Sequence, residues 1–129
     1  MQEKVEDWIL KAEGDFRTAL RELAAADESA CDAVCYHAHQ CIEKLMKAVL
    51  VARGMDPPRT HNLIHLSELL AQSTRAWSAS VDDVEWLTRG GVGFRYPGTF
   101  ATRNQAGKAI EICKHLREEL RRLLNLDSG

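Results

Sequence analysis

The stretch from residue 35 to residue 66 constrains the fold of this chain more than any other part of its sequence. Its first part is a long helix pattern, in which apolar residues recur every three or four positions. Pro57 and Pro58 then prevent the helix from continuing, because proline lacks the backbone N–H and clashes with the preceding turn. A second helix pattern follows the pair His61 and Asn62. We therefore expect two helices with a sharp break between them.

The same 3.6-residue period runs through most of the chain and predicts five helices. They are expected over residues 2–26, 29–53, 62–72, 80–90 and 103–125. Ser29 with Asp32 is typical of an N-terminal cap, and Gly54 of a left-handed C-terminal cap. Thr102 and Gln105 form a capping box before the last helix. With no strand pattern, the predicted fold class is all-α: an up-and-down antiparallel bundle of four to five helices, with a Gly-rich loop before the last long helix.

The length of 129 residues predicts one domain over residues 1–126, with a frayed C-terminus at 127–129. A formal net charge of -2 gives no overall field toward nucleic acid or an anionic membrane, so any affinity for anions must be local. No apolar run is long enough to span a membrane, and the N-terminus lacks the core of a signal peptide. We therefore expect a cytoplasmic protein with no membrane partner and reduced cysteines.

Residues 90–101, GGVGFRYPGTFA, contain four glycines and one proline and are predicted to form a loop. No acidic residue lies between Glu85 and Glu111, whereas four basic residues do: Arg89, Arg95, Arg103 and Lys108. Arginine can hold a phosphate through two parallel donors, and aromatic rings can stack on a base. This pattern predicts a nucleotide or RNA phosphate site that includes Arg95, Tyr96 and Arg103. The alternative is a connector whose aromatic side chains close the end of the bundle.

A polar stripe lies on the second predicted helix, where Gln40, Glu43, Lys44 and Lys47 recur at i, i+3, i+4 and i+7. One interpretation is that Lys44 and Lys47 hold a phosphate while Gln40 and Glu43 read a base or orient a lysine. A second is structural, with Glu43 and Lys47 as an ordinary ion pair of one helix. A third is that the stripe faces another helix or a second subunit. His61, at the entrance of the third helix, is either a member of the site or a capping residue.

Metal binding and standard catalytic arrangements are not expected. Cys31, Cys35 and His39 follow one another at intervals of four residues, which would suit zinc ligands in pairs. The first and last of them are about 12 Å apart along a helix, however, which is too far for joint ligation. No nucleophile–base arrangement or nucleotide-binding loop motif can be identified. Apart from a nucleotide ligand, no cofactor is predicted.

Three motifs, taken together and in order, resemble the HEPN domain family. They are Gln40-x-x-Glu43-Lys44-x-x-Lys47-Ala48, then Thr60-His61-x-Leu63, then Arg95-Tyr96-Pro97. The resemblance covers nearly the whole chain and implies a helical bundle that is usually dimeric and associated with nucleotides or RNA. It also implies a minimal nucleotidyltransferase as a partner, since many small members form toxin–antitoxin-like pairs with one.

Some members of that family are metal-independent RNases with an Arg-x(4–6)-His motif near the start of the last helix. In this chain the expected histidine positions after Arg95 hold Phe100, Ala101 and Thr102. Our leading hypothesis is therefore a non-catalytic, homodimeric HEPN-like module that binds nucleotide or RNA phosphate, a nucleotidyltransferase partner, or both. One alternative is an RNase toxin that uses a substitute base such as His115. Another is a scaffold that serves only for protein assembly.

Overall fold

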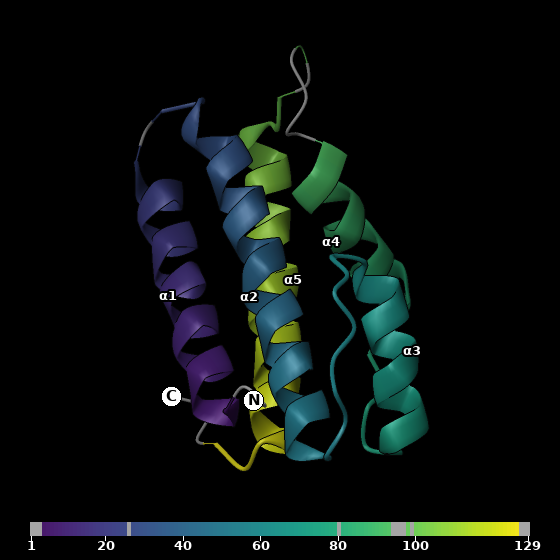
Figure 1. Ribbon diagram of the computed structural model, residues 1–129. Helices are drawn as coiled ribbons and strands as arrows, with labels where there is room; N and C mark the ends of the chain where they lie inside the picture. The colour runs from purple at the N-terminus through teal and green to yellow at the C-terminus, as the bar shows by residue number, and fades with distance from the viewer. Residues whose placement is uncertain (1–3, 26, 80, 94–97, 99, 127–129) are drawn as a thin grey trace.

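The computed structural model describes residues 4–25, 27–79, 81–93, 98 and 100–126, with only the backbone described for residues 90–93. Within these ranges it contains helices and no strand. The helices are α1 (Val5–Ala24), α2 (Ala30–Ala52), α3 (Leu63–Ser73), α4 (Val81–Gly93) and α5 (Arg103–Leu123), as Figure 1 shows. The prediction of an all-α helical bundle is confirmed. None of these helices is both long enough and apolar enough to cross a membrane.

Helix α2 lies at the centre of the bundle and contacts each of the other four helices. In Figure 1, α1 flanks it on one side, α3 and α4 lie on the other, and α5 runs behind it. Every residue of α2 from Ala38 to Leu50 is buried, except Lys44. A helix with neighbours on all sides cannot keep a solvated face, so the polar stripe predicted on this helix lies largely inside the protein.

The core is formed by aliphatic and small side chains. Helix α1 contributes the buried alanines Ala12 and Ala19, which allow close contact between α1 and α2. The aliphatic side chains buried in α3, α4 and α5 are Leu63, Leu66, Leu70, Val84, Leu87, Ile110, Ile112, Leu116 and Leu120. Each such side chain contributes roughly 1.5–3 kcal/mol when it is removed from water, which holds the bundle together.

Two of the predicted helix ends are confirmed. At the end of α2, Gly54 has a φ of 80°, and the N–H groups of Gly54 and Met55 donate to the carbonyls of Val51 and Leu50, both at 2.9 Å. These two bonds form a Schellman motif, which suits glycine because it has no Cβ to clash at positive φ. At the start of α5, Thr102 and Gln105 form the predicted capping box.

The predicted cap of α2 is wrong. Ser29 has helical backbone angles and makes no side-chain cap hydrogen bond. The carboxylate of Asp32 instead accepts the N–H of Ala101 at 2.6 Å. Asp32 therefore ties the first turn of α2 to the segment that leads into α5, rather than closing its own helix.

Helix α4 continues to Gly93, beyond the end predicted at Gly90 and Gly91. The first part of the expected glycine loop is therefore helical. A glycine in a helix costs about 1 kcal/mol relative to alanine, which the packing of α4 against α2 and α3 can offset. The rest of the predicted loop lies mostly outside the described residues.

The connection between α2 and α3 is extended and runs back beside α2. In Figure 1 it climbs from the lower end of α2 before α3 begins. Residues that precede a proline are restricted to extended backbone, so Pro57 and Pro58 keep this segment from coiling. Asn62 then caps α3, because its side chain accepts the N–H groups of Ile64 and His65. The path of this connection brings His61 against the middle of α2.

Candidate functional site

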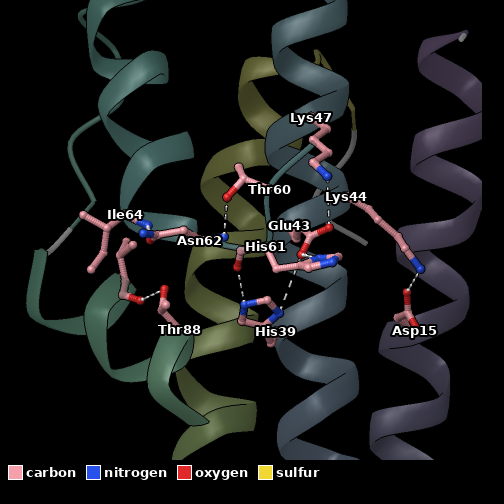
Figure 2. A network of polar contacts seen from close by, with 11 residues as sticks. Asp15, His39, Glu43, Lys44, Lys47, Thr60, His61, Asn62, Ile64 and Thr88 are labelled. Atoms are coloured by element: carbon pink, nitrogen blue, oxygen red, sulfur yellow. Dashed lines mark hydrogen bonds and ion pairs between the residues drawn. The ribbon is translucent and has the colours of Figure 1, made fainter. Parts of the chain in front are cut away.

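A buried carboxylate, that of Glu43, is the centre of a polar network between α2 and the α2–α3 connection (Figure 2). Its Oε2 accepts a hydrogen bond from Nζ of Lys47 at 3.1 Å, and its Oε1 accepts one from Nδ1 of His61 at 3.0 Å. The side chains of Glu43 and Lys47 are only 4% and 8% exposed. Neither charge is well hydrated, so each depends on the other for its compensation.

His39, which lies on α2, contacts the backbone of the α2–α3 connection at His61. Its Nε2 lies 2.9 Å from the backbone carbonyl of His61, and its Nδ1 lies 3.9 Å from Oε1 of Glu43. A carbonyl only accepts hydrogen bonds, so Nε2 of His39 carries a proton. His61 is therefore held twice, through its backbone by His39 and through its ring by Glu43.

The imidazole of His61 differs from the rest of the network because its side chain is 73% exposed. The carboxylate of Glu43 requires a proton on Nδ1, so in the neutral ring the lone pair is on Nε2. Nε2 forms no hydrogen bond with the described residues. The arrangement is an accessible imidazole nitrogen whose ring is oriented by a buried anion.

A second network links α2 to α1. Asp15, on α1, accepts from Nζ of Lys44 through Oδ2 and from Nδ1 of His37 through Oδ1, the latter at 2.8 Å. Nζ of Lys47 also lies 5.5 Å from the centroid of the Trp8 ring. Both lysines of the polar stripe thus face α1 or their own helix.

The burial of Gln40 and the ion pairs of Lys44 and Lys47 favour the structural interpretation of the stripe. The ammonium groups of Lys44 and Lys47 are compensated by Asp15 and Glu43, and Gln40 is buried. Phosphate binding by these residues stays a prediction. Of the sequence-predicted site residues, these three lie on α2, and the structure brings His61, on the α2–α3 connection, against the same helix. Sequence reasoning missed Asp15 and considered His39 only as a zinc ligand, although the spacing of four residues from His39 to Glu43 was a usable signal.

A second candidate site is a cavity of about 610 Å³ at the start of α5. It is lined by Glu28, Ser29, Phe100, Ala101, Thr102, Arg103 and Asn104. Phe100 is 73% exposed, so it does not close the end of the bundle as one alternative expected. Arg103 is exposed and forms no ion pair with any described residue. Arg95 and Tyr96 lie outside the described residues.

The first turn of α5 has backbone donors available beside this cavity. The capping box uses the N–H groups of Thr102 and Gln105, and Asp32 uses that of Ala101. The N–H groups of Arg103 and Asn104 form no hydrogen bond with the described residues. Backbone N–H groups at a helix N-terminus carry partial positive charge and favour anions.

The two candidate sites are separate. Asp32, beside the cavity, and Glu43, at the centre of the buried network, are eleven residues apart on α2, which corresponds to about 16 Å along the helix axis.

Two of the other basic residues between Glu85 and Glu111 already have partners within the protein. Arg89 pairs with Glu85 at 3.2 Å, and Nζ of Lys108 lies 5.0 Å from the Trp86 ring.

The cysteine side chains are buried thiols. Burial, with the nearby charge of Asp32 as a smaller cause, raises the pKa of Cys35 to about 12. A hydrogen bond with Cys113 and burial raise the pKa of Cys41 well above its ordinary value. A thiol must lose its proton to ligate a metal, and a raised pKa opposes that loss. Among the described residues, no group of three or more His, Cys, Asp or Glu side chains is arranged to hold a metal ion.

Comparison with known proteins identifies the family. A search of curated proteins finds no match. The crystal structure of TT1696 from Thermus thermophilus has a similar fold, with a TM-score of 0.75 over 92% of this chain and 97% of that one, at 22% sequence identity. The family model of the HEPN domain matches residues 5–123, which is most of the chain and includes all five helices. The chain therefore belongs to the HEPN domain family.

Proposed function

We propose that this HEPN chain is a non-catalytic module that binds a nucleotide or an RNA phosphate in the cavity at the start of α5. The observation that carries the proposal is the chemistry of the residues that line that cavity. It combines an exposed aromatic ring, Phe100, with the guanidinium of Arg103, which pairs with no described carboxylate. A phosphate and a base are the two chemical groups that such a wall suits.

The phosphate would lie against the first turn of α5. Arg103 supplies a charged fork of donors, and the N–H groups of Arg103 and Asn104 add the positive end of the helix. No acidic residue follows before Glu111, so this side of the cavity has no competing carboxylate from its own segment. Arg95 and Tyr96, a few residues upstream, are proposed as further contacts on the basis of the sequence pattern.

The base would stack on Phe100. A volume of about 610 Å³ is within the range of about 300–1,000 Å³ that is typical of small-molecule sites. Glu28, which also lines the cavity, would repel a phosphate but can accept a hydrogen bond from a ribose hydroxyl or a base N–H group. This polarity predicts one orientation, with the phosphate toward Arg103 and the sugar or base toward Glu28.

Binding measurements test this proposal. Purified protein is titrated with ATP, GTP and a short single-stranded RNA at low salt, because phosphate contacts weaken as salt rises. Arg103→Ala and Phe100→Ala are expected to weaken binding, whereas Arg89→Ala is the matched control, since Arg89 pairs with Glu85 away from the cavity lining. Absence of binding at millimolar ligand, or an equal effect of all three substitutions, would contradict the proposal.

The partners implied by the family, a second copy of this chain and a minimal nucleotidyltransferase in a toxin–antitoxin-like pair, are part of the same proposal. Mass measurement in solution, alone and with a candidate nucleotidyltransferase, tests them. Cleavage of the RNA during the titration, lost in Arg95→Ala, would instead support the RNase alternative.

A further inference from the structure

His61 is an exposed side chain held by a buried charged assembly. Glu43 and Lys47 are removed from water, yet a buried ion pair gives little net stability compared with an apolar pair of similar volume. Stability alone therefore does not account for placing a charge here. What the buried carboxylate does in addition is to fix the ring of His61, while His39 fixes its carbonyl.

The chain contains five histidines, and their environments differ in the two properties that control reactivity at a ring nitrogen. His61 is held by a carboxylate and exposed, whereas His37 is held by Asp15 but only 28% exposed. His65 and His115 are exposed but form no hydrogen bond with a described carboxylate, and His39 is buried. His61 alone combines an oriented ring with an accessible Nε2 among these five residues, all of which the structure describes.

We propose that Nε2 of His61 is a covalent acceptor of a phosphoryl group. In the step, the lone pair of Nε2 attacks the phosphorus of a phosphoryl donor and forms an N–P bond. The bond from phosphorus to the leaving group breaks, and the leaving group departs with that electron pair. The proton on Nδ1 stays in its hydrogen bond to Glu43, whose negative charge offsets the positive charge on the ring.

The exposure of His61 suits the role of an acceptor, because an accepted group needs a nitrogen that a donor can reach. Arg59, exposed and two residues earlier on the same extended segment, is placed in sequence to offset the charge of a phosphoryl group. The extended connection would therefore carry both the nucleophile and a cation.

Phosphoramidate is the probe that tests this reactivity, because it donates its phosphoryl group to imidazoles and releases ammonia. The whole chain is treated at about pH 8.5, where ordinary imidazoles are neutral. Phosphorus NMR and mass mapping of peptides then give a rate for each histidine. We expect His61 to react about tenfold faster than His65 and His115. His37 and His39 should react more slowly still.

Glu43→Gln tests the cause, because the amide keeps an oxygen near His61 but removes the charge. We expect it to lower the rate at His61 to that of His65, and His61→Gln to abolish the fast phase while leaving the other rates unchanged. If Glu43→Gln fails to fold, the order of the phosphorylation rates of the histidines in the wild-type chain decides whether the proposal stands. Equal rates at His61, His65 and His115 would overturn the proposal. Nucleotide binding in the α5 cavity should be the same in His61→Gln, so the two proposals fail separately.

Discussion

Nδ1 of His61 lies 3.0 Å from Oε1 of Glu43, so a largely exposed imidazole is fixed by a carboxylate that is itself almost fully buried. The same carboxylate compensates Lys47 through its other oxygen. One buried group thus serves both the interior of the bundle and a residue on its surface. The energetics of that group and the chemistry of the surface residue can be tested separately.

The first prediction concerns the buried ion pair. Glu43→Leu or Lys47→Met alone leaves one charge buried without its partner, which should lower the free energy of unfolding by about 3–5 kcal/mol. The double variant removes both charges and should lose much less than the sum of the two single effects. Urea unfolding of the four proteins measures the coupling. Additive effects would show that water already compensates these charges.

The second prediction concerns the docking of α1. Asp15→Asn removes the charge that meets Lys44 and His37, and should lower the free energy of unfolding by about 1–3 kcal/mol. Glu85→Gln is the control, because the pair of Glu85 with Arg89 is exposed and should contribute at most about 0.5 kcal/mol. Thermal unfolding at equal salt compares them. Equal shifts in Tm would mean that the α1–α2 network does not support the bundle.

Much of the fold could be predicted from the sequence because helix periodicity and end signals are local. Gly54 and the pair of Thr102 and Gln105 act within a few residues of themselves, and their roles were predicted correctly. The cap assigned to Ser29 failed because Asp32, the residue expected to complete it, binds a backbone N–H group 69 residues away. Local spacing carries no information about a competing partner of that kind.

The candidate sites also depend on contacts between residues that are far apart in the sequence. The polar stripe of α2 was identified, and contact with another helix was one of its three interpretations. The choice among them stayed open, because a sequence does not show that one helix has neighbours on all sides. The contact of His61 with Glu43 depends on the path of the extended connection, which two prolines restrict but do not determine. The helix period places Asp15 on the same side of α1 as Ala12 and Ala19, but it does not identify the partners of Asp15 on α2.

The third prediction is a dependence of stability on high pH. The pKa of Cys35 rises from 9.0 to about 12 in the folded chain, so the folded state holds this proton more tightly than the unfolded state does. Its contribution to stability is complete below a pH of 9.0 and is lost as the pH rises toward about 12. Cys35→Ala should therefore show a shallower loss of unfolding free energy over this range. Parallel curves for both proteins would contradict the shift.

The fourth prediction concerns the salt dependence of nucleotide or RNA binding. Arg103→Ala should reduce the slope of log affinity against log salt by about 0.7 for a single-stranded RNA, because one phosphate contact is lost. Phe100→Ala should weaken binding without changing that slope, since stacking releases no counterion. Titrations at several salt concentrations separate the two effects. The same slope in Arg103→Ala and the wild type would remove Arg103 from the phosphate site.

The fifth prediction concerns the link between α2 and the cavity. Asp32→Ala leaves the N–H of Ala101 without its acceptor, and should lower the free energy of unfolding by about 1–3 kcal/mol. It should also weaken nucleotide binding, because Ala101 stands between Phe100 and the first turn of α5 on the cavity wall. Ser29→Ala should change stability by less than about 0.5 kcal/mol, since Ser29 makes no cap hydrogen bond. If Ser29→Ala is the more damaging substitution, Ser29 does cap α2 and Asp32 does not position the cavity.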